Sequence, residues 1–351
     1  MAHPWADLSS PLKQDFAHCA ALIAQGSRTF HAASMLLPQH VRMPAFAIYA
    51  FCRLSDDAVD GEEGQKGDRA AIIHRLKSKL DDAYSGVAQD DAADRAFAYV
   101  IERFQIPKTL PSALIDGLAF DAAGGECQTL SDLHAYSARV ASSVGAMMTV
   151  LMGVREKLVL ARACDLGVAM QFSNIARDVG EDARNGRLYL PNDWLAEVGI
   201  DRAAWLENPV FDERIGRLVQ RLLGLAETLY TRSAGGIAGL PMVCRPAMHA
   251  ARIIYREIGR EVARRGYNSV DSRAVISGRR KIALLPGAIA ASVVFNRMSQ
   301  DQALAETEFL VAAVPACGYA TNPWTGPIDE RIGRILEIFG KMNERERQVH
   351  S

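Results

Sequence analysis

The sequence contains few cysteines, and these form no motif. Six cysteines are scattered over 351 residues, and none of them forms a Cys-x-x-Cys pair. This spacing indicates neither a zinc site nor a disulfide framework, and it is typical of reduced thiols in a cytoplasm. A P-loop, a Gly-x-Ser-x-Gly element and a Glu-x-x-His pair are also missing. These absences argue against nucleotide hydrolysis, a serine hydrolase and a ferritin-like di-iron site.

The chain also lacks a strong net charge and a long hydrophobic run. The formal net charge is -1, so no global field attracts nucleic acid. The longest apolar run, residues 282–295, is shorter than the roughly 20 residues of a spanning helix, and Pro286 interrupts it. Residues 1–10 resemble no secretory signal. We therefore expect a cytoplasmic protein that binds no nucleic acid, and the sequence leaves peripheral contact with the inner face of the membrane open.

Helical periodicity extends through most of the chain. Apolar residues recur three and four positions apart in stretches rich in Ala, Leu, Met, Arg and Glu, and alternation at period two is scarce. The predicted fold class is all-α, with helices over residues 11–25, 43–60, 68–85, 90–104, 110–122, 130–153, 156–182, 212–233, 243–265 and 271–296. Residues 1–296 are predicted to form one domain. Residues 297–351 contain three prolines and are predicted to form a C-terminal extension.

One acidic stretch lies at the end of the predicted helix 43–60. Spacings of four, three and four place four of its residues on one helix face: Tyr49, Arg53, Asp56 and Asp60. Carboxylates near a helix C-terminus oppose the macrodipole, and a bound cation would remove that penalty. A single Asp-x-x-x-Asp pair is nevertheless more often a solvated helix end.

A second stretch repeats this construction at the end of the predicted helix 156–182. Its shared face carries Gln171, Asn174, Asp178 and Asp182. Amide and carboxylate oxygens can ligate Mg²⁺, and the neighbouring Arg177 has the planar fork that suits phosphate. An ordinary polar helix face would explain one copy, but the repetition favours a shared function. We interpret the two stretches as carboxylate clusters that meet across a helical bundle and hold divalent cations with a diphosphate.

Two basic segments and the predicted helix 130–153 each allow a functional and a purely structural interpretation. Arg28 and the basic stretch from Arg273 to Lys281 could contact a diphosphate, although solvated basic faces explain them equally well. The predicted helix 130–153 carries many small residues and several methionines. These could form the wall of a site for a long apolar chain, but tight helix packing is the more frequent reason for such a pattern.

Together these motifs resemble the squalene/phytoene synthase family. The resemblance covers about residues 15–295 and rests on Ser27-Arg-Thr-Phe, Leu36-Leu-Pro, residues 49–60, Tyr136 with Val140-Ala141 and Val144-Gly145, residues 165–182 and Gly186-Arg-Leu-Tyr-Leu-Pro. The run from Met147 to Gly167 is most similar to bacterial 15-cis-phytoene synthases. Two positions differ from the family pattern, because Ser142 replaces a usual Gly and Asn268-Ser269 replaces a common Asp-Val.

The resemblance implies an isoprenoid synthase fold, a helical bundle with a central cavity. It also implies a prenyltransferase of carotenoid biosynthesis that joins two geranylgeranyl diphosphates head to head. The product would be 15-cis-phytoene, formed through a cyclopropyl (prephytoene) diphosphate with release of diphosphate. Mg²⁺ is the expected ion, with Mn²⁺ as a substitute, and no NADPH is expected. Prenyl diphosphates are the expected substrates, and downstream carotenoid enzymes are candidate partners.

The resemblance further assigns roles to individual residues. The metal ligands would be Asp56, Asp60, Asn174, Asp178 and Asp182. The substrate-binding residues would be Arg28, Tyr49, Arg53, Asn174, Arg177, Tyr189 and Lys281. Tyr136 and Gln171 would face the reacting carbons, and Tyr189 would help to close the mouth of the cavity.

Three alternatives remain at this point. Squalene, dehydrosqualene or hydroxysqualene synthesis from farnesyl diphosphate would use the same motifs, because substrate length depends on the depth of the cavity. A non-catalytic assembly-factor relative would share the fold, but its acidic motifs would be expected to degrade. A terpene cyclase would carry a different second motif, so the Asp178-x-x-x-Asp182 spacing argues against it.

Overall fold

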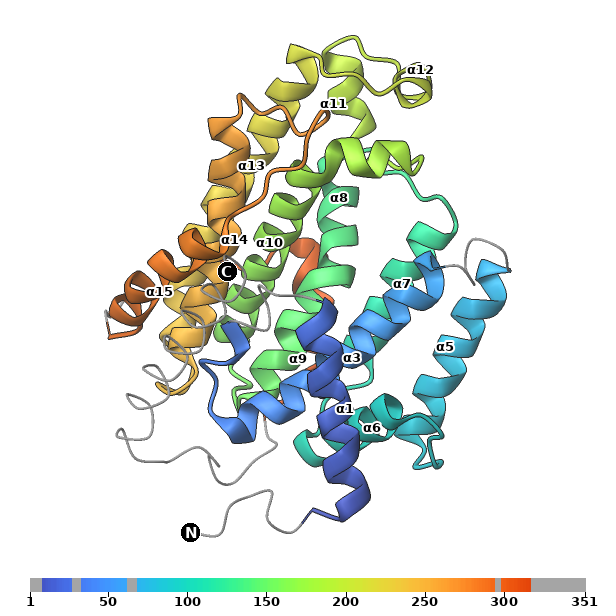
Figure 1. The fold of residues 1–351 in the computed structure, drawn as a ribbon, viewed down its shortest axis with the longest axis vertical. Helices are drawn as coiled ribbons and strands as arrows, with labels where there is room; N and C mark the ends of the chain where they lie inside the picture. The colour runs from blue at the N-terminus through green and yellow to red at the C-terminus, as the bar shows by residue number, and fades with distance from the viewer. Residues whose placement is uncertain (1–7, 27–32, 62–67, 294–297, 317–351) are drawn as a thin grey trace, which may run out of the picture.

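The computed structural model of the protein describes residues 8–26, 33–61, 68–293 and 298–316. These residues form helices and loops, with no strand among them, which confirms the expected all-α class. No helix in these ranges has both the length and the apolar composition needed to cross a membrane. Figure 1 shows α10 (Lys157–Arg184) running through the middle of the bundle.

Helices of the first half surround one side of α10. They are α1 (Ser10–Gly26), α3 (Gln39–Asp60), α5 (Arg69–Tyr84), α6 (Ala92–Phe104), α7 (Thr109–Ala122), α8 (Leu130–Ser137) and α9 (Ser143–Leu151). On the other side, α13 (Glu213–Ile237) and α14 (Arg245–Arg264) pack directly on α10, and α15 (Gly278–Val293) packs on α14 (Figure 1). The shorter helices are α11 (Asn192–Glu197), α12 (Arg202–Glu207), η2 (Ala305–Thr307) and α16 (Glu308–Ala312).

The predicted helix 130–153 contains one turn of π-helix. This turn, η1 (Ala138–Ser142), joins α8 to α9 directly after Tyr136. It packs on α10 at Gly167, where a Cβ atom would lie 2.6 Å from the Cα atom of Ser142. The Ser142 hydroxyl donates a hydrogen bond to the Cys164 carbonyl at 2.7 Å. The serine at this position is therefore buried and bonded, and the close approach of the two backbones is allowed by the glycine on α10.

The prediction of a helix over residues 271–296 was wrong at its N-terminal end. Helix α15 begins only at Gly278, and residues 273–277 are not helical. Ala274 and Ile276 are buried while Arg273, Val275 and Ser277 are exposed. This alternation at period two is the pattern of extended backbone. The helical pattern of the residues that follow masked it in the sequence.

Residues 298–316 pack on the bundle rather than apart from it. The buried Arg162 donates hydrogen bonds to the carbonyl groups of Asp301 and Gln302 at 3.0 and 3.2 Å. Leu310 and Val311 of α16 are buried in the main core. This part of the predicted C-terminal extension is thus held by the domain before it. The remainder, residues 317–351, contains two of the three prolines and lies outside the described residues.

Candidate active site

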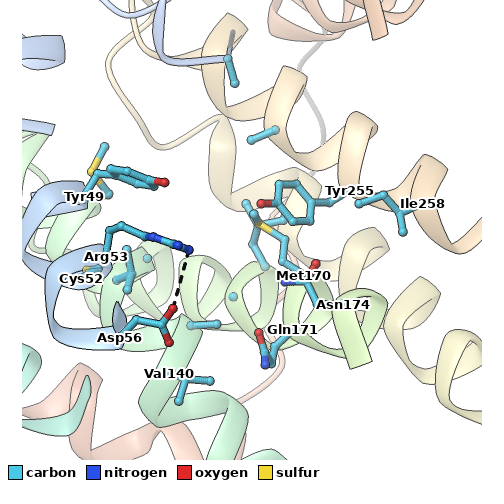
Figure 2. A pocket seen from close by; sticks show the side chains of 18 of the residues that line it. Tyr49, Cys52, Arg53, Asp56, Val140, Met170, Gln171, Asn174, Tyr255 and Ile258 are labelled. Atoms are coloured by element: carbon cyan, nitrogen blue, oxygen red, sulfur yellow. Dashed lines mark ion pairs between the residues drawn. The ribbon is translucent and has the colours of Figure 1, made fainter. Parts of the chain in front are cut away.

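A large cavity lies between α3, α10 and α14. Its volume is about 720 Å³, which is within the range of ligand pockets. Figure 2 shows Tyr49, Arg53 and Asp56 on α3 facing Gln171 and Asn174 on α10 across this space, with Tyr255 of α14 above. The two predicted acidic helix ends therefore belong to opposite walls of one cavity.

The α3 wall carries a crowded group of acidic residues. Arg53 binds Asp57 at 2.7 Å and lies 3.8 Å from Asp56, so one guanidinium serves two carboxylates. Burial, reinforced by the nearby Asp60, raises the pKa of Asp56 to about 6. A carboxylate that resists ionisation in this way is stabilised in its charged form by a cation.

The α10 wall is acidic too, but arginines cover part of it. Asp178 accepts hydrogen bonds from the Nε atoms of Arg177 and Arg273, both at 2.7 Å. Both arginines line the cavity. Burial, together with Asp178 and Glu181, raises the pKa of Asp182 to about 7. On this wall, two arginines therefore neutralise the charge of Asp178, whereas the ionised form of Asp182 is disfavoured.

Two interactions connect the walls, a pair of hydrogen bonds and a longer-range effect of charge. Arg187, just beyond α10, donates hydrogen bonds to both oxygens of Asp60 on α3, at 2.6 and 2.9 Å. Asp121, in the last turn of α7, is the second connection, because it raises the pKa of both Asp56 and Asp182 through its charge. The acidic groups of both walls therefore lie within electrostatic reach of Asp121.

Asp121 also orders two tyrosines that the sequence singled out. The hydroxyls of Tyr136 and Tyr189 each donate a hydrogen bond to this carboxylate at 2.8 Å, and their rings stack with centroids 4.9 Å apart. Sequence reasoning missed Asp121. It is one of two aspartates on a largely apolar helix, and its partners lie 15 and 68 positions away along the chain. Only the tertiary structure brings these groups together.

Arg273 reaches Asp178 because the loop before α15 crosses α10 at a glycine. A Cβ atom on Gly180 would lie 2.0 Å from the carbonyl oxygen of Val270. The Gly180 amide donates a hydrogen bond to the Ser269 carbonyl at 3.1 Å. Sequence reasoning placed Arg273 only in a basic stretch. The local signal that the loop crosses α10 is Gly180, which lies between Asp178 and Asp182.

The structure locates nearly all of the predicted site residues. Those that line the cavity are Tyr49, Arg53, Asp56, Tyr136, Gln171, Asn174, Arg177 and Lys281. Those that lie next to it, joined through hydrogen bonds or neighbouring charges, are Asp60, Asp178, Asp182 and Tyr189. Arg28 lies outside the described residues.

Most of the remaining lining of the cavity is apolar. Along α10 its lining passes from Arg177 through Met170 and Gly167 to Ala163. With a rise of 1.5 Å per residue, Ala163 lies about 22 Å from Asp178 along the helix axis. Met148 of α9 and Met248 of α14 also line the cavity. A ligand with a charged head at the acidic walls and a long hydrocarbon tail toward Ala163 would match this polarity.

The acidic walls fit divalent cations in their chemistry. Within the described residues, no three His, Cys, Asp or Glu side chains are grouped closely enough to hold one ion as they stand. Asp60 and Asp178 are instead paired with arginines. The donors on offer are carboxylate and amide oxygens, which hard cations prefer. Burial first, and neighbouring carboxylates second, raise the pKa of Asp56 and Asp182, and a bound cation would favour the charged form of both.

Comparison with known proteins adds independent information. The family model described as "Squalene/phytoene synthase" matches residues 23–280. A phytoene synthase of Cereibacter sphaeroides is 52% identical over 343 residues, which cover 95% of this chain and 95% of that protein. A phytoene synthase of Rhodobacter capsulatus is 53% identical over 271 residues, covering 77% and 80%. A 15-cis-phytoene synthase of Pantoea ananas is 34% identical over 275 residues, covering 76% and 89%.

Solved structures agree on the fold. The chain is similar to a dehydrosqualene synthase in complex with a ligand, with a TM-score of 0.72 and 31% identity, covering 80% of this chain and 96% of that one. It is also similar to the squalene synthase HpnC of Alicyclobacillus acidocaldarius, with a TM-score of 0.68 and 24% identity, covering 74% and 97%. The predicted helical bundle with a central cavity is therefore the fold of these enzymes.

Proposed function

Because the chain belongs to the squalene/phytoene synthase family, we propose that it is a phytoene synthase, a prenyltransferase of carotenoid biosynthesis. It joins two geranylgeranyl diphosphates head to head, through a cyclopropyl (prephytoene) diphosphate, and releases diphosphate and 15-cis-phytoene. The observation that supports this activity most strongly is a largely apolar cavity with acidic α3 and α10 walls at one end.

The residues of the two walls would bind and ionise the diphosphate. Arg53, Arg177 and Lys281 line the cavity at its charged end, and a guanidinium fork binds phosphate oxygens in a fixed geometry. Neutralised charge makes diphosphate a better leaving group, which lowers the barrier to an allylic cation. Arg28 and Tyr49 are proposed to help at the same end. Arg273 joins this set because it lines the cavity beside Asp178.

The apolar part of the cavity would protect the reacting carbons. An allylic cation survives only where water is excluded, and the apolar side chains of Met148, Met170 and Met248 help to exclude it. Tyr136 and Gln171 line the region between the acidic walls and this apolar space, where they would face the reacting carbons. Tyr189 would help to close the mouth above them.

We propose Mg²⁺, with Mn²⁺ as a substitute, as the ion that these walls hold. The proposed ligands are Asp56, Asp60, Asn174, Asp178 and Asp182. When bound, the ion would supply Lewis-acid neutralisation of the diphosphate. The residues themselves contribute crowded carboxylates whose charge favours a cation, as the raised pKa values of Asp56 and Asp182 indicate.

Two observations favour a twenty-carbon substrate over farnesyl diphosphate. The relative from Cereibacter sphaeroides that is 52% identical carries the name phytoene synthase, whereas the dehydrosqualene synthase is 31% identical. The small side chain of Ala163 also lines the cavity far from the acidic walls. Farnesyl diphosphate remains the substrate of the second candidate, a dehydrosqualene synthase.

The hydrocarbon product supports a cytoplasmic location with peripheral contact at the inner face of the membrane. Phytoene has no polar group and partitions into lipid. Transfer to the lipid phase or directly to downstream carotenoid enzymes would therefore complete the reaction cycle. Both the membrane contact and these enzymes are proposals that follow from the product.

Incubation of the purified protein with each prenyl diphosphate tests the proposed function. With geranylgeranyl diphosphate and Mg²⁺ we expect a forty-carbon hydrocarbon in the lipid extract, and chelation should abolish it. A thirty-carbon product from farnesyl diphosphate alone would favour the second candidate. No product from either substrate would favour a non-catalytic relative.

A further inference from the structure

A buried carboxylate stands between the acidic walls and the apolar cavity without belonging to either acidic motif. Asp121 lies in the last turn of α7 and is only 9% exposed, although it lines the cavity. A negative charge at a helix C-terminus is unfavourable, and burial of a carboxylate adds to this penalty. A position with two such penalties indicates a functional reason for the residue.

Two phenols compensate for the burial of this carboxylate. The Tyr136 hydroxyl donates to Oδ2 of Asp121 and the Tyr189 hydroxyl donates to Oδ1, both at 2.8 Å. The two rings stack at an interplanar angle of 16°, and Phe120 packs against Tyr136 with ring centroids 5.4 Å apart. Each oxygen of Asp121 therefore holds one tyrosine, and the rings are fixed by one another and by Phe120.

We propose that Asp121 is a positioning residue that holds Tyr136 against the reacting carbons and increases the electron density on its phenol. This inference rests on the proposed function. Because the Tyr136 hydroxyl donates its proton to Asp121, it does not present that proton to the cavity that Tyr136 lines. A charge-assisted hydrogen bond from a phenol makes its oxygen more negative, and such an oxygen stabilises a nearby carbocation. Tyr189, from the segment after α10, is the second group fixed by the same carboxylate.

The substitution Asp121→Asn tests the proposal, because an amide keeps the shape and removes the charge and one acceptor. We expect kcat for phytoene formation to fall at least 100-fold while KM for geranylgeranyl diphosphate stays within threefold. The thermal stabilisation by Mg²⁺ with inorganic diphosphate should also remain. Asp116→Asn on the same helix is the matched control, since Asp116 is exposed and pairs with Lys77 at 2.8 Å. It should behave as wild type.

A second variant keeps the proposal testable if Asp121→Asn folds poorly. Tyr136→Phe removes the same hydrogen bond from the other side, and the double variant should be no slower than the slower single variant. Independent, multiplying losses would contradict the proposal, as would Asp121→Asn with kcat within threefold of wild type. A fall in kcat accompanied by equal loss of stabilisation by Mg²⁺ and diphosphate would also contradict it, because Asp121 would then act in diphosphate binding. A wild-type protein inactive on both prenyl diphosphates would contradict the proposed function instead.

Discussion

Gly180 on α10 touches the carbonyl oxygen of Val270 so closely that a Cβ atom there would lie 2.0 Å from it. This contact fixes the loop that presents Arg273 to Asp178, where the two side chains form a hydrogen bond of 2.7 Å. One glycine between the aspartates of the second motif thus links the α10 wall to a segment about 90 residues further along the chain.

Replacement of this glycine should therefore affect both stability and activity. Gly180→Ala must displace the backbone of Val270, and we expect a loss of about 2–3 kcal/mol in the free energy of unfolding. Activity should fall as well, because the loop carries Arg273. Gly224→Ala on α13 is the control, since a Cβ atom there meets nothing within 4 Å. The control should gain up to about 1 kcal/mol in the free energy of unfolding. Equal stabilities of the two variants in chemical denaturation would contradict the close contact between Gly180 and Val270.

The segment that follows α15 is predicted to depend on one buried arginine. Arg162 is fully buried, pairs with Asp165 at 2.9 Å and donates to the carbonyls of residues 299–302. Arg162→Met would leave the buried Asp165 with Arg232 as its remaining ion-pair partner. We expect a loss of about 3 kcal/mol in the free energy of unfolding. The control Lys77→Met breaks an exposed ion pair with Asp116 and should change the free energy of unfolding by less than about 1 kcal/mol. Similar effects of the two variants would show that Arg162 does not hold residues 298–316.

The pKa of Asp182 is raised to about 7. This value predicts how the stability of the Asp182→Asn variant, relative to wild type, changes with pH in the absence of divalent ions. Between pH about 4 and 7 the folded protein holds the Asp182 proton and the unfolded chain has lost it. The contribution of this residue to stability therefore decreases as pH rises through that window. Asp182→Asn should match wild type near pH 4 and exceed it by about 1–2 kcal/mol at pH 8. A variant whose advantage is constant, or grows toward low pH, would contradict this assignment.

The far end of the cavity is predicted to select the substrate length. Ala163 lies about 22 Å from Asp178 along α10, and one isoprenoid unit spans roughly one helical turn. Ala163→Phe should therefore reduce turnover of geranylgeranyl diphosphate at least tenfold and leave turnover of farnesyl diphosphate within threefold. Met148→Ala, which enlarges the same end, should keep the longer substrate. The ratio of forty- to thirty-carbon products measures this directly, and an unchanged ratio in Ala163→Phe would place the end of the hydrocarbon elsewhere.

Local patterns were sufficient to predict most of the long helices and the acidic motifs. The faces of α3 and α10 follow from spacings of three and four residues, and the structure confirms that Asp56 and Asn174 line one cavity. Asp121 could not be predicted in this way, because its role depends on two tyrosines from other segments. The extended residues 273–277 were misread as helix, since helical residues follow them directly. The packing of α16 depends on contacts with α9 and α10 that leave no periodic signal in the sequence.

The central claim is that α3 and α10 form one site for a metal-bound diphosphate, and thermal stabilisation by Mg²⁺ with inorganic diphosphate tests it most directly. A ligand that binds only the folded protein raises its apparent stability. Wild type and the control Asp116→Asn should be stabilised equally by the two ligands together, and chelation should remove the effect. Asp56→Asn on α3 and Asp178→Asn on α10 should each lose most of this stabilisation. Full stabilisation in either of the two variants would contradict a shared site.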